Sequence, residues 1–161
     1  TKQVTYGDKY GELAKPSKEG YTFEGWYLED TFNTEITENV TVEIASNHIL
    51  YAKWKIRTFE LIINPAGGRY EGSEENIKQI LEYKQTITLS EPTREGYTFE
   101  GWSINGKATI ANNELTIGDE NTIVSAMWKK YITAEEVSYT PANPNWKVTN
   151  VRQALDYLLN N

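Results

Sequence analysis

The side chains best suited to acid–base or metal chemistry are few and scattered along the chain. His48 is the only histidine among 161 residues, and there is no cysteine. A single histidine cannot build a His-rich metal site, and a chain without cysteine has no thiolate nucleophile, no Cys-ligated metal and no disulfide. His48 stands directly before the apolar run at 49–52, so we expect it at the entrance of a strand rather than in a catalytic site.

Two adjacent pairs of glutamates are present, but neither suits hydrolysis. Glu74-Glu75 and Glu135-Glu136 stand in a predicted helix start and in a polar linker, whereas a glycosidase needs two carboxylates facing each other across a cleft. The run at 119–121 lacks the alternating spacing of a calcium loop. Gly67-Gly68 follows a predicted strand, but the Gly-Lys-Ser/Thr ending of a phosphate loop is missing. We therefore expect no catalytic, cofactor or metal site, and a protein that is not an enzyme.

Charge and composition narrow the classes of partner. The net charge is −7 and the pI about 4.8, which disfavours nucleic acid and anionic membranes because both require clustered Lys and Arg. No stretch approaches the ~20 apolar residues of a membrane helix, so we expect no membrane insertion. Thr1 in place of an initiator Met suggests a piece of a longer protein.

One eight-residue sequence, EGYTFEGW, occurs twice, at 19–26 and at 95–102. A second anchor pairs LYAKWK at 50–55 with VSAMWK at 124–129. A catalytic centre rarely needs copying in tandem, whereas a structural unit often does. We therefore predict a first repeat at 1–56, a second at 57–130, and a tail at 131–161 that combines an extended linker with a helix.

The repeated octet predicts a strand with one irregularity. Tyr21 and Phe23 alternate with polar residues, as in a half-buried strand, but strict alternation would turn Trp26 toward the polar face. A bulge at Gly25 would return Trp26 to the face of the other rings. We predict the same device in the second copy, and a structural core made by the anchors of both repeats: Tyr21, Phe23, Gly25, Trp26, Trp54, Tyr97, Phe99, Gly101, Trp102 and Trp128.

The elements around the octets favour an α+β fold, a small mixed sheet with one helix on a face. In the second repeat we predict strands at 57–64, 85–89, 114–117 and 122–128, and a helix that Ser73 caps and that carries the stripe Ile77, Ile80 and Leu81. Asn105-Gly106 predicts a hairpin. The first repeat lacks the opening strand and helix and begins with a strand at 2–7, which predicts an unpaired sheet edge.

The first copy, YGELAKPSKEGYTFEGWY with a closing LYAKW, resembles the Listeria–Bacteroides repeat of bacterial cell-surface proteins, which is related to the B-repeats of internalins. The second copy departs from the pattern at Ser103, Ser125 and Met127. The resemblance implies tandem β-grasp-like repeats on secreted or wall-attached proteins, without catalytic residues. It implies an extracellular, cell-surface location and a host or cell-wall protein or glycan as partner.

The tail predicts a short amphipathic helix. Asn150 is its expected N-cap, with Gln153 completing a capping box. The segment TNVRQALDYL is similar to one that recurs in phage tail fibres and bacterial surface proteins. A helix this short needs a docking surface, within the chain or in an oligomer. The predicted docking stripe consists of Val151, Ala154, Leu155, Leu158 and Leu159.

Two functions from different classes fit these features. The first is a non-catalytic spacer, stalk or adhesion surface, which the short connection between Trp54 and Thr58 would stiffen. The second is a carbohydrate- or peptide-binding module that uses exposed rings outside the shared core. Acceptance of a partner strand at the incomplete first sheet is a third reading. The candidate ligand contacts are Tyr27, Phe32, Tyr70, Tyr139 and Trp146.

Overall fold

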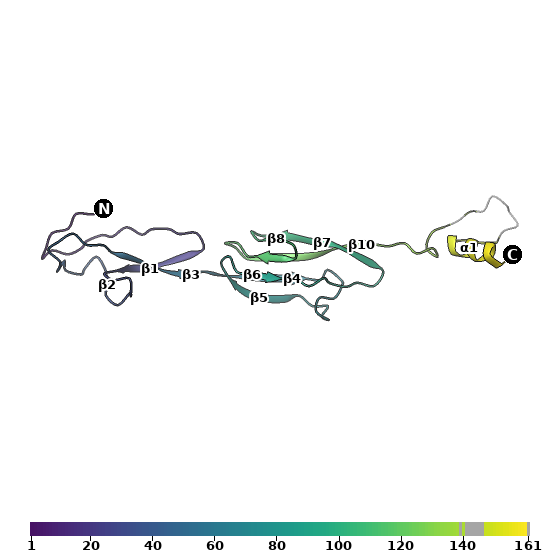
Figure 1. Ribbon diagram of the computed structural model, residues 1–161, viewed down its shortest axis with the longest axis horizontal. Coiled ribbons are helices and arrows are strands. Elements are labelled where there is room, and N and C mark those ends of the chain that lie inside the picture. Colours follow the sequence, from purple (N-terminus) through teal and green to yellow (C-terminus); the bar gives the residue numbers. More distant parts are fainter. Residues whose placement is uncertain (139, 141–146, 161) are drawn as a thin grey trace. The chain divides into compact units, whose positions relative to one another are not determined.

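The computed structural model describes residues 1–138, 140 and 147–160. The described chain is built mainly of strands, and its one helix lies in the tail (Figure 1). The strands form three sheets with the orders β2-β1-β3, β5-β4-β10-β7 and β6-β9-β8. The elements are β1 (Tyr21–Tyr27), β2 (Glu35–Ile36), β3 (Tyr51–Ile56), β4 (Thr58–Asn64), β5 (Ile77–Glu82), β6 (Thr86–Thr88), β7 (Tyr97–Asn105), β8 (Thr109–Ala111), β9 (Glu114–Thr116), β10 (Thr122–Lys130) and α1 (Val151–Asn160).

The chain divides into two compact units that interleave along the sequence. The first comprises Thr1–Ile63, Ile77–Leu89 and Ile104–Ile123, and the second comprises Asn64–Asn76, Ser90–Ser103 and Val124–Asn161. The first unit thus contains the whole first repeat, the β4–β5 hairpin up to Ile63, and the small β6-β9-β8 sheet.

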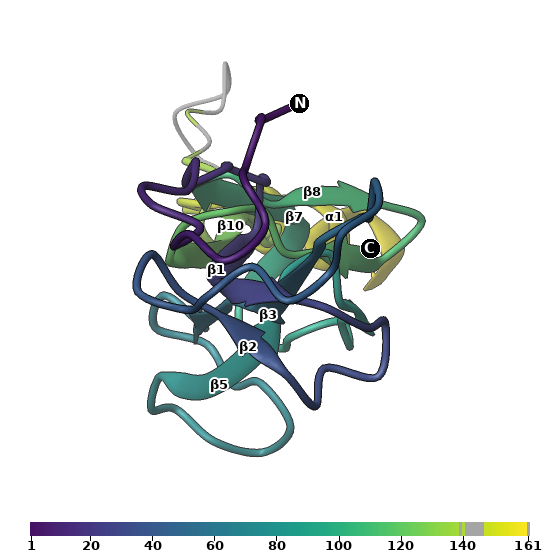
Figure 2. The same cartoon turned by 90° about the vertical axis from the view of Figure 1, so that its left-hand side faces the viewer.

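The sheet of the first repeat is antiparallel, with β1 hydrogen-bonded between β2 and β3. Figure 2 views the chain from the side on which these three strands lie. Its register shifts between Phe23 and Gly25, which confirms the predicted bulge. One side of the repeat buries Tyr10, Ile36 and Val42, and Trp26 packs against this cluster. The bulge therefore keeps Trp26 on the buried side of the strand, as the octet predicted.

The predicted helix after Ser73 is wrong, because residues 77–82 form strand β5. β5 pairs with β4 in antiparallel register, with Leu81 opposite Phe59 and Ile80 opposite Glu60. Leu81 is buried while Ile80 is 65% exposed, so these neighbours point to opposite faces as in a strand and do not share a helical stripe. The Ser73 hydroxyl accepts a hydrogen bond from the Glu75 backbone N–H at 3.1 Å, a local turn contact rather than a helix cap.

The predicted strand at 2–7 is also wrong. Residues 2–7 form no strand, and Gly7 N–H donates to Val42 O at 2.9 Å. The residues that follow continue these separate contacts, with Tyr10 N–H to Val40 O at 2.9 Å. No ladder forms because glycine at 7 and 11 adopts a positive φ and bends the chain. The pairings of β1, of β4 with β5, and of β9 are antiparallel, and a β-grasp topology stays a prediction.

Strands occur at the other predicted places in the second repeat, but the hairpin lies elsewhere. Asn105-Gly106 ends β7, which belongs to a different sheet from β8. The two-residue hairpin is Asn112-Asn113 between β8 and β9, where Ala111 pairs with Glu114. Both asparagines have positive φ, 52° and 63°, as a type I′ turn requires.

Candidate functional site

The two octets place three rings in the same mutual arrangement. In the first repeat, Phe23 meets Trp26 and Trp54 edge to face, each at 5.5 Å between ring centroids. In the second repeat, Phe99 meets Trp102 at 5.3 Å and Trp128 at 5.7 Å. These rings, the flanking Tyr21 and Tyr97, and the bulge-position glycines Gly25 and Gly101 are half-buried. The triads therefore stabilise the sheets while one side of the rings remains accessible to solvent.

A cation lies over the tyrosine of each octet. The Lys18 ammonium lies 3.9 Å from the Tyr21 ring centroid, and the Arg94 guanidinium lies 3.9 Å from that of Tyr97. Such contacts contribute about 0.5–1 kcal/mol at exposed sites. The repeated sequence therefore encodes a cation–tyrosine pair as well as the ring triad.

The repeats differ in what covers the octet glycine. In the first repeat the ring of Tyr83 packs directly on Gly20, so that any Cβ at residue 20 would overlap the ring. Tyr83 also meets Tyr21 edge to face at 6.3 Å. Nothing lies within 4 Å of a Cβ built on Gly96, and this glycine is half-exposed while Gly20 is buried.

Backbone hydrogen bonds also connect the two repeats at this place. We call the contact formed by Gly20, Arg57 and Tyr83 the junction. The Arg57 N–H donates to the Gly20 carbonyl at 2.9 Å, and the Tyr83 N–H donates to the Arg57 carbonyl at 2.9 Å. The corresponding bond of the second repeat runs from Tyr131 N–H to Gly96 O at 3.2 Å. Arg57 thus links Gly20, in the turn before β1, to Tyr83, in the turn that follows β5.

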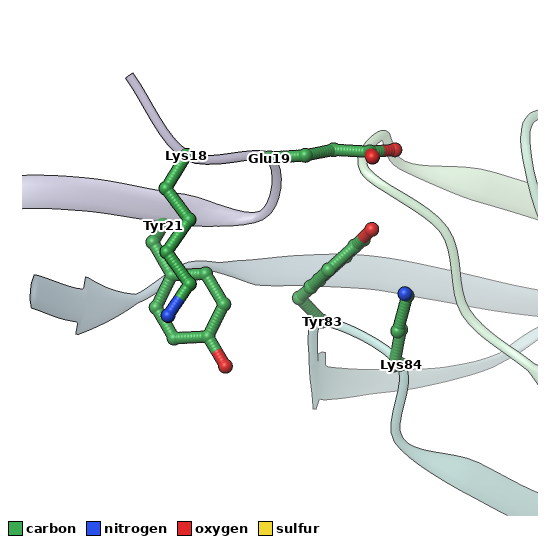
Figure 3. Close-up of a pocket in the computed structure, with 5 residues that line it drawn as sticks. All are labelled: Lys18, Glu19, Tyr21, Tyr83 and Lys84. Atoms are coloured by element: carbon green, nitrogen blue, oxygen red, sulfur yellow. The ribbon is translucent and has the colours of Figure 1, made fainter. Parts of the chain in front are cut away.

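A shallow hollow of about 340 Å³ lies at this junction, lined by Lys18, Glu19, Tyr21, Tyr83 and Lys84. In Figure 3 the Lys18 side chain turns toward the Tyr21 ring, while Glu19 extends in another direction. The ammonium of Lys84 lies 5.2 Å from the Tyr83 ring centroid. The amines of Lys18 and Lys84 are thus both engaged with aromatic rings of the hollow.

An exposed ion pair lies next to the junction. Lys107 Nζ is 3.0 Å from the Asp119 carboxylate. The hydrogen bond from Lys107 lowers the pKa of Asp119, and the same bond raises the pKa of Lys107. The hydrogen bond of the pair is the largest cause of both pKa shifts.

The residues considered for chemistry are not brought together. The His48 ring donates from Nδ1 to the Ser46 carbonyl at 3.0 Å, and its Nε2 accepts from the Tyr10 hydroxyl at 2.7 Å. Glu74 pairs with Arg69, and the tail carboxylates pair with Lys130 and Arg152. In the described part of the chain, no three His, Cys, Asp or Glu residues are grouped closely enough to hold a metal ion.

The rings proposed for ligand contact have different environments. Tyr27 and Phe32 meet edge to face at 5.5 Å on the first sheet, and Phe32 is 39% exposed. Tyr70 is buried, packs against Trp102 at 5.7 Å and accepts the Ser90 N–H, so its ring does not offer a surface. The candidates Tyr139 and Trp146 lie outside the described residues.

The tail helix has the predicted cap. The Asn150 side chain accepts the Gln153 N–H at 2.9 Å, while Gln153 Oε1 accepts from Thr149 rather than from the N-cap itself. Along the predicted stripe, Ala154 is buried and Val151 half-buried, whereas the leucines at 155, 158 and 159 are exposed. Oligomerisation through this stripe stays a prediction.

Sequence reasoning missed Tyr83 and Tyr51. Tyr83 has no equivalent in the first repeat, because the first repeat lacks the opening strands of the second. The comparison of the two repeats therefore gave no signal for Tyr83. Tyr51 lies in the anchor at 50–55, which indicated only that the two repeats are similar. Its replacement by Ser125 in the second repeat was the available signal.

The family of the chain follows from comparison with known proteins. The Listeria-Bacteroides repeat domain matches residues 1–53 and again residues 65–127, so the chain belongs to this family and is a module of two such repeats. The match ends before the tail, and the tail's similarity to phage tail fibres stays a prediction.

Three relatives are similar to this chain. Two are Evansella cellulosilytica proteins, provisionally named a membrane protein (30% identical, covering 78% of this chain and 20% of the relative) and a Gly-rich membrane protein (36% identical, 62% and 11%). The third is Internalin H of Listeria monocytogenes, 32% identical over 56% of this chain and 16% of its own length. The chain thus spans a fifth or less of these relatives. No solved structure gives a significant match.

Proposed function

We propose that this chain is a non-catalytic spacer module of a bacterial cell-surface protein, and that the junction at Gly20 and Tyr83 limits bending between its repeats. The observation that carries the proposal is the Tyr83 ring seated on Gly20. An aromatic contact and two backbone hydrogen bonds at one connection restrict its torsions more than a free linker does.

The surface location is supported by the relatives, one named an internalin and two provisionally named membrane proteins. Among the described residues, no helix combines the length and apolarity needed to cross a membrane.

The test is a comparison of the rotational correlation times of the two repeats by ¹⁵N NMR relaxation. We expect residues 1–56 and 57–130 to tumble with one correlation time, and the Tyr83→Ala variant to show two. The matched control is Tyr131→Ala, which removes a ring that is 51% exposed beside the corresponding glycine, Gly96. Independent tumbling of the repeats in the unsubstituted chain would overturn the proposal.

A further inference from the structure

The outer face of the first sheet carries a group of rings that the second repeat lacks. Tyr27 and Tyr51 are direct cross-strand partners on β1 and β3. Phe32, in the loop after β1, packs edge to face on Tyr27. We call Tyr27, Phe32 and Tyr51 the aromatic face. In the second repeat, the positions of the two tyrosines hold Ser103 and Ser125, although the ring triads of both repeats agree closely.

This difference separates the aromatic face from the framework of the fold. The Ser103 hydroxyl donates to the Ser125 carbonyl at 3.2 Å, so the same pair of strands forms without either ring. Phe32 and Tyr51 are each 39% exposed, and the sheet does not require their rings. Exposed rings of this kind indicate a binding surface.

The backbone at Phe32 supports a role in binding. Its φ is 56°, the left-handed region, which costs a bulky side chain about 1–2 kcal/mol. The loop is fixed around it: both carboxylate oxygens of Glu29 accept bonds from Thr34, at 2.7 and 3.0 Å, and the Phe32 N–H donates to the Glu29 carbonyl at 3.2 Å. A strained conformation held in place by its surroundings is characteristic of a preorganised functional position.

The polar groups around the rings carry both signs of charge. Lys53 lies 5.3 Å from the Tyr27 ring centroid and 3.5 Å from the carboxylate of Glu24. The Glu35 carboxylate and the Tyr27 ring flank Gly25 on the same side of the strand. The face therefore offers one ammonium donor, two carboxylate acceptors and phenol hydroxyls.

These features favour a sugar ring over other ligands. Sugar hydroxyls both donate and accept, which fits a rim with both kinds of group, and the C–H face of a pyranose is apolar enough to lie on aromatic side chains. An exogenous cation is disfavoured because Lys53 already occupies the Tyr27 ring. A protein partner would need about 800 Å² of surface, far more than three side chains provide.

We propose that the aromatic face of the first repeat binds a neutral pyranose of an oligo- or polysaccharide, with Phe32 and Tyr51 as the main ring contacts. This site is separate from the repeat junction and does not depend on the spacer proposal. One ring pair of this kind binds weakly, with a dissociation constant in the millimolar range.

The test titrates cellohexaose, chitohexaose and maltohexaose into the ¹⁵N-labelled chain and follows amide shifts and saturation transfer from the protein. We expect at least one hexasaccharide to shift residues of β1, β3 and the loop 28–34, and not the equivalent strands of the second repeat. In Phe32→Gly and in Tyr51→Ser, which copies the second repeat, we expect the affinity to fall about tenfold.

Phe32→Gly keeps the test independent of folding. Glycine accepts the left-handed backbone, so this variant should retain or slightly raise the melting temperature while it loses binding. Tyr131→Ala, an exposed ring of the second unit, serves as the control and should bind like the unsubstituted chain. The proposal is overturned if none of the three sugars binds at millimolar concentration, or if both ring variants bind as tightly as the unsubstituted chain.

Discussion

The ring of Tyr83 lies against the backbone of Gly20, leaving no space for a side chain at residue 20. The two residues come from different repeats, and a shared partner, Arg57, hydrogen bonds to both through its backbone. The octet glycine thus has a different role in each copy, since in the second repeat no atom occupies the corresponding space at Gly96.

A second glycine is required for steric reasons. A Cβ on Gly68 would overlap the Trp128 ring and approach the Thr93 carbonyl oxygen at 2.6 Å. The same ring donates from Nε1 to the Pro65 carbonyl at 2.9 Å. We expect Gly68→Ala to lower the free energy of unfolding by about 1–3 kcal/mol, because a backbone oxygen cannot move aside as a side chain can. Urea denaturation measures this loss. An unchanged free energy of unfolding in Gly68→Ala would contradict the steric explanation.

The β8–β9 hairpin depends on asparagine at a left-handed position. We expect Asn112→Ala to destabilise the chain by about 1 kcal/mol, because alanine lacks the local hydrogen bonding that makes positive φ tolerable for asparagine. The measurement is the shift in denaturant midpoint. Asn112→Gly is the matched control and should stay within a few tenths of a kcal/mol of the unsubstituted chain. A larger loss for glycine than for alanine would show that the side chain, not the backbone, matters here.

The stability of the first repeat should fall at high pH through Tyr10. Burial raises the pKa of the Tyr10 phenol above its ordinary value of 10.0. A group with a raised folded-state pKa contributes its full stability below the unfolded pKa and loses it as the pH rises through the folded pKa. We therefore expect the free energy of unfolding to be unaffected by Tyr10 up to about pH 10 and to decline above it.

Tyr10→Phe isolates this contribution. At neutral pH the variant should lose about 1 kcal/mol, since the hydrogen bond to His48 is removed. Above pH 10 its stability should decline less steeply than that of the unsubstituted chain, as followed by denaturant titration at several pH values. Parallel curves for the two proteins would rule out Tyr10 as a source of the alkaline loss.

The sequence was most informative where the pattern is local. Alternating rings and one glycine predicted the β1 strand and its bulge, because side-chain direction in a strand depends only on neighbouring residues. The stripe of Ile77, Ile80 and Leu81 predicted a helix wrongly. Apolar residues at this spacing fit a helix, but they also fit a strand in which one isoleucine is exposed. The pairing of β5 with β4 decided between the two, and that pairing is not visible in a window of ten residues.

The junction and the aromatic face could be predicted only in part. Tyr83 and Gly20 are 63 positions apart, and their contact depends on the hairpin that carries Tyr83. Tyr27 and Phe32 were recognisable as rings outside the shared core. The left-handed backbone of Phe32 was not, because it arises from the hydrogen bonds of Glu29 and Thr34 around it.

The most direct test of the central claim, that Tyr83 on Gly20 couples the two repeats, compares Gly20→Ala with Gly96→Ala. Both glycines have nearly the same positive φ, 74° and 77°, so the backbone cost of alanine is shared at about 1 kcal/mol. Only Gly20→Ala displaces the Tyr83 ring, and it should lose a further 1–3 kcal/mol or so in urea denaturation. Equal losses in the two variants would contradict the claim and leave the repeats connected only by their linker.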